Sequence, residues 1–389
     1  MSKVLTVVGA RPQFIKAAPV SRALLLANNT EFLVHTGQHY DRQMSHVFFA
    51  ELGIRPPDLN LNVGSGNHGA QTGAMLAGLE RTILEQKPDW VLVYGDTNST
   101  LAGALAAAKL HVPVAHVEAG LRSFNRQMPE EINRIVADAL AAVLFVPTEA
   151  GRQNLLREGV AEDRICWTGD VLFDAMLFFR ELANRSSCAL NRLGLRNTPF
   201  VLATVHRAEN TDDPARLIAI IEGLRGVAKT LRVILPLHPR TRTRLGQLRL
   251  LETKPLEIIE PVGFLDMIHL EAAAQVIATD SGGVQKEAFF HGVPCVTLRG
   301  ETEWTELLDL GWNRLVPALR ADAIAETILA ARGVKGRAAM PYGDGHASGR
   351  IVHALHCRDC SHQEKARWTF EPPLNPAVPP QPLTLSPQS

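Results

Sequence analysis

The alternation of short β-branched runs with longer helical stretches constrains the fold of this chain more than any other feature. The first half predicts strands at 4–8, 31–36, 90–94, 112–117 and 143–146. Helix-like periods lie between them at 14–27, 71–86, 97–110 and 130–139. Strands that alternate with helices predict βαβ units, and therefore a parallel sheet covered on both faces.

A second alternating set follows Asp170. It predicts strands at 200–204, 233–237, 257–259, 276–279 and 295–298, with helices at 214–229, 264–274 and 283–291. The stretch 184–198 is the most irregular, and we place a linker between Asp170 and Thr198. We therefore expect an α/β protein with two Rossmann-like doubly wound domains, at 1–170 and 171–345, that face a cleft, where such sheets bind ligands.

Composition excludes several classes of protein. A chain of 389 residues with 46% hydrophobic residues is long and apolar enough to fold as two or three domains. Its 40 basic and 40 acidic residues balance, so no overall field attracts nucleic acid or a membrane surface. No apolar run approaches the ~18 residues of a membrane span. Five cysteines are too few for a disulfide scaffold at this size, which favours a cytoplasmic protein.

The end of the chain differs from the rest. Segment 363–389 is rich in proline and lacks apolar periodicity, which predicts a disordered tail. A small group precedes it and contains a Cys-x-x-Cys: His353, His356, Cys357, Cys360 and His362. Zinc ligation is one interpretation. No second Cys-x-x-Cys is present, so we expect no metal at this cluster.

Two segments that follow predicted strands could bind phosphate. Gly9 permits a tight turn after the first strand, and Arg11 and Lys16 add cations near the next helix start. The alternative is a plain turn with solvated charges. In the second half, Ser281, Gly282 and Gly283 could seat a diphosphate, with Glu287 one turn further on near ribose. The alternative there is a capped helix.

Carboxylates follow the ends of two other predicted strands. Asp96 and Glu118 would face the cleft and are candidates for acid/base catalysis, and Glu130 opens the next helix. Each could instead cap a helix or form an ion pair. His206 leaves the first strand of the second half, and His238 has a similar position two elements later.

Six motifs occur together, each weak alone: G-A-R-P-Q-F-I-K, Y-G-D-T-N-S-T, H-V-E-A-G-L-R, P-E-E-I-N-R, H-R-A-E-N and T-D-S-G-G-V-Q-K-E-A. In this order they resemble the UDP-N-acetylglucosamine 2-epimerase family of the non-hydrolysing bacterial type. The resemblance runs from about Lys3 to about His356. It implies a glycosyltransferase-B-like fold whose final helix, at 346–362, packs back on the first domain.

The resemblance also implies an isomerase that interconverts UDP-GlcNAc and UDP-ManNAc for surface polysaccharide synthesis. The reaction would eliminate UDP to a 2-acetamidoglucal and add it again after protonation on the opposite face. No NAD and no catalytic metal would be required. The partner is then a UDP-sugar, and we expect a homodimer.

Individual residues carry over by motif. Asp96, Glu118 and Glu130 match the catalytic carboxylates of the family, and His206 matches a histidine that contacts the nucleotide phosphate. Binding positions are matched by Arg134 and Glu287. Which carboxylate removes the proton stays open. Gln38 and His39 correspond to the region of an allosteric UDP-GlcNAc pocket.

The sequence departs from the common family pattern at Ala10 and Gln13, in the loop 123–128, and at Trp304. These variants resemble a branch that acts on UDP-2,3-diacetamido-2,3-dideoxy-glucuronate. Gln13 removes a negative charge and Arg126 adds a cation, which would suit a sugar carboxylate. The alternative is that Gln13 is a neutral exchange without effect on the ligand and that Arg126 is solvated. A glycosyltransferase, a hydrolysing epimerase and an inactive sugar-nucleotide sensor are the rival functions.

Overall fold

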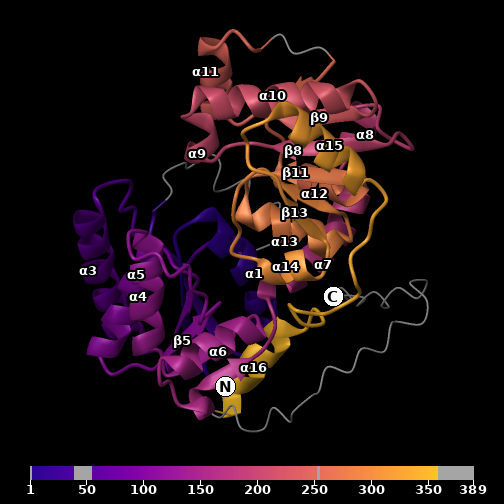
Figure 1. Ribbon diagram of the computed structural model, residues 1–389. Coiled ribbons are helices and arrows are strands. Elements are labelled where there is room, and N and C mark those ends of the chain that lie inside the picture. Colours follow the sequence, from indigo (N-terminus) through magenta and orange to yellow (C-terminus); the bar gives the residue numbers. More distant parts are fainter. Residues whose placement is uncertain (1, 39–54, 252–254, 358–389) are drawn as a thin grey trace, which may run out of the picture.

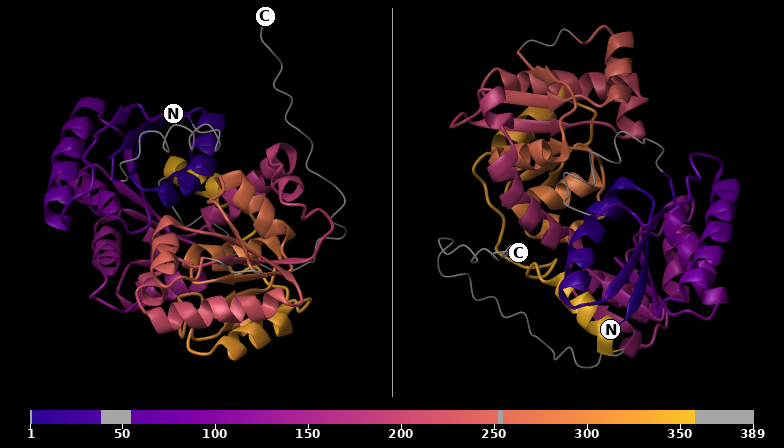
Figure 2. Two further views of the ribbon diagram at one scale, coloured as in Figure 1. Left: turned by 90° about the horizontal axis from the view of Figure 1, so that it is seen from above. Right: turned by 180° about the vertical axis from the view of Figure 1, so that it is seen from behind.

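The computed structural model describes residues 2–38, 55–251 and 255–357. Two parallel sheets, each covered by helices on both faces, lie in separate halves of the molecule, as Figure 1 and Figure 2 show. The predicted fold class, with two doubly wound units, is confirmed.

The first sheet has seven parallel strands in the order β3-β2-β1-β4-β5-β6-β7. Its strands are β1 (Lys3–Val8), β2 (Thr30–His35), β3 (Leu59–Asn60), β4 (Trp90–Tyr94), β5 (Val114–Val117), β6 (Val143–Val146) and β7 (Ile165–Trp167). The helices between them are α1 (Arg11–Leu26), α3 (His68–Gln86), α4 (Asn98–Lys109), α5 (Pro129–Leu140) and α6 (Glu149–Arg157), with the short 3₁₀ turn η1 (Glu162–Arg164). The strand order reverses between β1 and β4, which is where such sheets bind ligands.

The second sheet has six parallel strands in the order β10-β9-β8-β11-β12-β13. They are β8 (Phe200–Thr204), β9 (Arg232–Pro236), β10 (Glu257–Ile259), β11 (Val276–Thr279), β12 (Cys295–Thr297) and β13 (Asn313–Leu315). Its helices are α9 (Ala208–Thr211), α10 (Pro214–Ala228), α11 (Pro239–Gln247), α12 (Phe264–Ala273), α13 (Gly282–His291), α14 (Thr305–Asp309) and α15 (Ala321–Ala331). Separate apolar clusters fill its two faces.

The segment in which we placed the linker, between Asp170 and Thr198, is largely helical. Helix α7 occupies Val171–Ser186, and the single turn α8 occupies Ala189–Arg192. Asp170 caps α7 by accepting a hydrogen bond of 2.8 Å from the Leu172 amide. Apolar side chains of α7 are buried at helical spacing, including Ala175 and Phe179, so tertiary packing stabilises a helix whose polar end looks irregular in sequence.

The last described helix, α16 (Ala347–Cys357), packs against α1 of the first half. The Trp90 indole donates a hydrogen bond of 3.2 Å to the Leu355 carbonyl. Asp174 of α7 caps the start of α16, accepting from the Ala347 and Ser348 amides at 3.1 and 2.8 Å. Cys360, His362 and the expected tail lie outside the described residues.

One apolar cluster continues from the first half into the second. It contains first-sheet residues such as Val8 and Tyr94, together with Phe264 and Ile268 of α12 and Phe290 of α13. The two halves therefore share a packed contact beside the carboxyl ends of their strands.

Candidate active site

A cavity of about 950 Å³ lies between the two halves. Every site residue expected from the sequence lines it: Arg11, Lys16, Asp96, Glu118, Glu130, Arg134, His206, Ser281, Gly282, Gly283 and Glu287. Asp96, Glu118, Glu130 and most of the cations come from the first half, and the glycine-rich segment with Glu287 comes from the second. His238 also lines the cavity.

Glu118 follows β5 and occupies a left-handed backbone conformation, with φ of +70°. Non-glycine residues rarely adopt that conformation, and those that do cluster at functional sites. Its carboxylate forms an ion pair with the Lys16 ammonium of α1. Burial would raise the pKa of Glu118, but the Lys16 and Lys286 ammonium groups outweigh it and lower that pKa to about 2.

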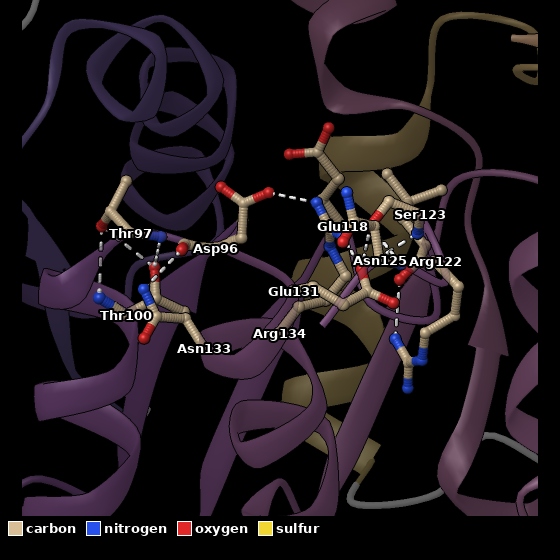
Figure 3. A network of polar contacts seen from close by, with 12 residues as sticks. Asp96, Thr97, Thr100, Glu118, Arg122, Ser123, Asn125, Glu131, Asn133 and Arg134 are labelled. Carbon is tan, nitrogen blue, oxygen red and sulfur yellow. Dashed lines mark hydrogen bonds and ion pairs between the residues drawn. The ribbon is translucent and has the colours of Figure 1, made fainter. Parts of the chain in front are cut away.

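Asp96 follows β4 and forms an ion pair with Arg134 of α5, which reaches toward it in Figure 3. The Asn133 side chain donates a hydrogen bond of 2.9 Å to the Asp96 carbonyl, so α5 holds the loop as well as the side chain. Burial raises the pKa of Asp96 although Arg134 opposes the shift. Asp96 and Glu118 are thus two nearby carboxylates whose pKa values are shifted in opposite directions.

The two glutamates at the start of α5 differ in surroundings. Glu131 is only 1% exposed, and it accepts hydrogen bonds from the Ser123 amide at 2.9 Å and the Phe124 amide at 3.1 Å. Burial would raise the pKa of Glu131, but these bonds and Arg134 bring it below its ordinary value. Glu131 therefore holds the loop 123–128 in place, whereas the exposed Glu130 lines the cavity.

In the second half, the buried Asp280 holds the turn that carries His206. Its carboxylate accepts hydrogen bonds of 3.1 Å from the His206 amide and 3.0 Å from the Arg207 amide. The His206 ring is 42% exposed, and its centroid lies 6.2 Å from that of His238. Burial, with Arg207 and His238 nearby, lowers the pKa of His206, although Asp280 acts in the opposite sense.

Ser281 caps α13 from the position directly after Asp280. Its hydroxyl accepts a 3.5 Å hydrogen bond from the Val284 amide, and Gly282 and Gly283 form the first residues of the helix. Free amides and the helix dipole favour an anion at such a helix start. This end of α13 lies in the lining of the same cavity as Arg11 and Lys16.

Glu287, on the second turn of α13, lies beside Glu271 of α12, and both line the cavity. Glu271 is 1% exposed, and burial raises its pKa to about 8. Burial and the Glu271 carboxyl raise the pKa of Glu287 to about 8 as well. Two carboxyl groups that resist ionisation can donate as well as accept hydrogen bonds.

A family model described as UDP-N-acetylglucosamine 2-epimerase matches residues 25–356. The chain belongs to this family. Its members named below are UDP-sugar 2-epimerases, which are isomerases. The match includes every site residue described above except Arg11 and Lys16, which precede it together with strand β1.

Relatives support membership along nearly the whole chain. A UDP-2,3-diacetamido-2,3-dideoxy-D-glucuronate 2-epimerase of Pseudomonas aeruginosa is 52% identical, with 91% of this chain and 99% of that protein covered. A UDP-N-acetylglucosamine 2-epimerase of Methanocaldococcus jannaschii is 44% identical, with 91% and 98% covered. The crystal structure of UDP-GlcNAc 2-epimerase from Neisseria meningitidis bound to UDP-GlcNAc superposes with a TM-score of 0.83 at 32% identity, covering 91% of this chain and all of that one.

The structure does not support the interpretation of Gln13 and Arg126 as sugar-binding changes. Gln13 is 2% exposed and lies outside the cavity lining, and its amide donates to the Tyr94 carbonyl at 2.8 Å and accepts from the Gly9 amide at 2.8 Å. It therefore holds the turn before α1. Arg126 is exposed and is absent from the lining of the cavity.

Sequence reasoning did not assign several residues of the cavity lining to the site, among them Glu271, Lys286 and Trp304, of which only Trp304 was noted, as a departure from the family pattern. The available signal was spacing, because Lys286 precedes Phe290 by four residues and so lies on the same face of α13, and both are buried. A lysine on such a helix indicates a paired, buried ammonium.

Among the described residues, no group of three or more His, Cys, Asp or Glu side chains is placed to hold a metal ion. Cys357 Sγ lies 3.6 Å from His353 Nε2, and Cys360 and His362 fall outside the described residues. Nor does any helix in the described part of the chain have the length and apolar character to cross a membrane.

Proposed function

We propose that this chain is a non-hydrolysing UDP-N-acetylglucosamine 2-epimerase, which interconverts UDP-GlcNAc and UDP-ManNAc. The observation that carries the proposal is the shared cavity, because it joins acid/base carboxylates of one half to an anion-binding helix start of the other. A reaction that breaks a sugar–diphosphate bond and moves a proton at the next carbon needs both.

The nucleotide would lie across the two halves. Arg11, Lys16 and His206, with the helix start at Ser281–Gly283, would bind the diphosphate, and Glu287 would accept from ribose hydroxyls. These groups also stabilise negative charge on UDP as it departs, which is the demanding part of the elimination.

The sugar would lie among Asp96, Glu118 and Glu130. A carboxylate takes the proton from carbon 2 while the bond from carbon 1 to oxygen breaks, and UDP leaves with the electron pair. UDP oxygen then returns to carbon 1, and an acid delivers a proton to the opposite face of carbon 2. The opposite pKa shifts of Asp96 and Glu118 suit one group that exchanges protons and one that stays ionised.

Incubation of UDP-GlcNAc with the protein in deuterated water tests this function directly. Epimerisation gives a mixture of UDP-GlcNAc and UDP-ManNAc, both deuterated at carbon 2, which NMR resolves. Free ManNAc and UDP would indicate a hydrolysing enzyme. No deuterium and no new sugar would remove this proposal and favour a glycosyltransferase or a sensor.

A second candidate substrate is UDP-2,3-diacetamido-2,3-dideoxy-glucuronate, favoured by the 52% identity to the Pseudomonas aeruginosa enzyme. The same incubation with this nucleotide, run beside UDP-GlcNAc, compares the two by kcat/KM.

A homodimer and a cytoplasmic location stay predictions from the sequence. Light scattering on the purified protein tests the predicted homodimer.

A further inference from the structure

Lys286 is a buried lysine of the cavity that the proposed mechanism does not use. Its side chain is 2% exposed, and Nζ lies 2.7 Å from Asp170 Oδ2 and 3.7 Å from Glu118 Oε1. Burial would lower the pKa of Lys286, but Asp170 and Glu118 reverse the shift and raise it. The side chain is therefore an ammonium held between two carboxylates.

Trp304 fixes the direction of this lysine. Lys286 Nζ lies 4.3 Å from the Trp304 ring centroid, a distance at which an ammonium is attracted to an indole face. The same indole donates a hydrogen bond of 2.9 Å to the Gly282 carbonyl. Trp304 thus connects Lys286 to the helix start that we assign to the diphosphate.

Glu118 is consequently bound from two sides. Lys16 of α1, in the first half, contacts Oε2, and Lys286 of α13, in the second half, approaches Oε1. The other charged groups that act on Glu118 are Arg134 of α5 and Asp96 after β4. Of these charged residues, Lys286 is the one that comes from the second half of the molecule, on α13.

We propose that Lys286 is a positioning residue for the proposed epimerase reaction, which holds the Glu118 carboxylate ionised and oriented from the opposite half of the molecule. Lys286 acts through Glu118 and does not contact the sugar. This inference rests on the proposed function. Because α13 also carries the diphosphate site, one helix links nucleotide binding to the acid/base group.

Lys286→Met removes the ammonium but keeps much of the apolar volume. We expect kcat to fall by about 10- to 100-fold, as for loss of a charged hydrogen-bonding partner, while the Kd for UDP stays within about twofold. The deuterium isotope effect on carbon 2 should increase, because proton transfer becomes slower relative to the other steps. A merely structural loss would reduce the active fraction and leave the isotope effect unchanged.

Lys286→Met also leaves Asp170 buried without its partner, so a second variant is needed. Lys286→Met combined with Asp170→Asn restores the charge balance and keeps an oxygen that can cap α7. If this double variant regains thermal stability but keeps the low kcat and the larger isotope effect, Lys286 acts through Glu118. If kcat returns to the wild-type value, Lys286 only neutralises Asp170 and the proposal is wrong.

Lys286→Arg should recover part of the lost kcat, and the exposed Lys335→Met serves as a matched control with wild-type kinetics. Wild-type deuterium exchange is measured first with UDP-GlcNAc and with the uronate nucleotide. Absence of exchange with both would overturn the proposed function and this inference together. An active wild type with an unaffected Lys286→Met variant would overturn this inference alone.

Discussion

His116 and Asp138 form a buried pair behind the cavity, with His116 Nδ1 2.7 Å from Asp138 Oδ1. The other ring nitrogen of His116 lies 2.7 Å from the Gly95 carbonyl oxygen. Each ring nitrogen of His116 thus has an oxygen atom within hydrogen-bond distance. Asp138 also accepts from Arg122 at 2.7 Å and from the Gly120 amide at 3.1 Å. The pair thereby connects the loops that carry Asp96 and Glu118.

We predict that His116→Phe destabilises the protein by about 1–3 kcal/mol, because it leaves the buried Asp138 carboxylate with one hydrogen-bond partner fewer. Urea denaturation measures the loss, and kcat should fall with it because the Gly95 turn loses its support. The exposed His353→Phe is the matched control. An unchanged urea midpoint in His116→Phe would show that the pair contributes no net stability.

Neutral variants of the acid/base candidates should separate turnover from binding. Asp96→Asn, Glu118→Gln and Glu130→Gln are each expected to lower kcat by about 10²- to 10⁴-fold, the usual contribution of proton transfer, with UDP affinity nearly preserved. Steady-state kinetics and calorimetry with UDP give the two values. Glu326→Gln, on the exposed face of α15, should behave as wild type. Near-normal kcat in Asp96→Asn and Glu118→Gln would favour the alternative that these side chains only cap and pair.

UDP binding should depend on His206. Since the pKa of His206 is lowered in the free protein, the ring is neutral near pH 7, whereas a diphosphate favours the charged ring. UDP binding is therefore coupled to proton uptake by His206. The affinity for UDP should increase as pH falls and decrease as pH rises. Calorimetry in buffers of different ionisation enthalpy measures the uptake. His206→Ala should weaken UDP binding and reduce the uptake, and equal uptake in the variant would contradict the assignment.

Glu271 and Glu287 should make the ligand-free protein less stable as pH rises. Both have a pKa of about 8 in the folded state against an ordinary value of 4.5, so the folded state binds more protons than the unfolded chain across this interval. The lowered pKa of the adjacent His291, about 4, has the opposite effect, but only below its ordinary 6.5. Stability should therefore fall between about pH 6.5 and 8, where one pKa unit corresponds to about 1.4 kcal/mol.

Glu271→Gln removes one of these groups and should raise the melting temperature at pH 8 more than at pH 6.5. Thermal unfolding followed by circular dichroism at both values gives the comparison, with Glu326→Gln as the control. A variant with the wild-type pH dependence would show that the buried carboxyl pair does not govern stability in this range.

The sequence by itself determined the two parallel sheets and the strand ends at which the candidate catalytic and binding residues lie. Strand and helix periods are local properties, so β4, β5, β8 and β11 could be predicted from neighbouring residues, and parallel connectivity then brings their carboxyl ends together. No helix was predicted at 171–186, because the polar end of this segment gives a weak local signal and the helix owes its stability to buried packing against other elements.

Only the tertiary structure decided how the side chains pair. Glu130 and Glu131 are adjacent in sequence, yet one lines the cavity and the other is buried under hydrogen bonds from a loop. Lys286 reaches Asp170 and Glu118 through packing of elements far apart in the chain, and Glu271 meets Glu287 because helices α12 and α13 pack together. Burial and charge partners set the protonation of such groups, and both depend on residues that no local pattern brings together.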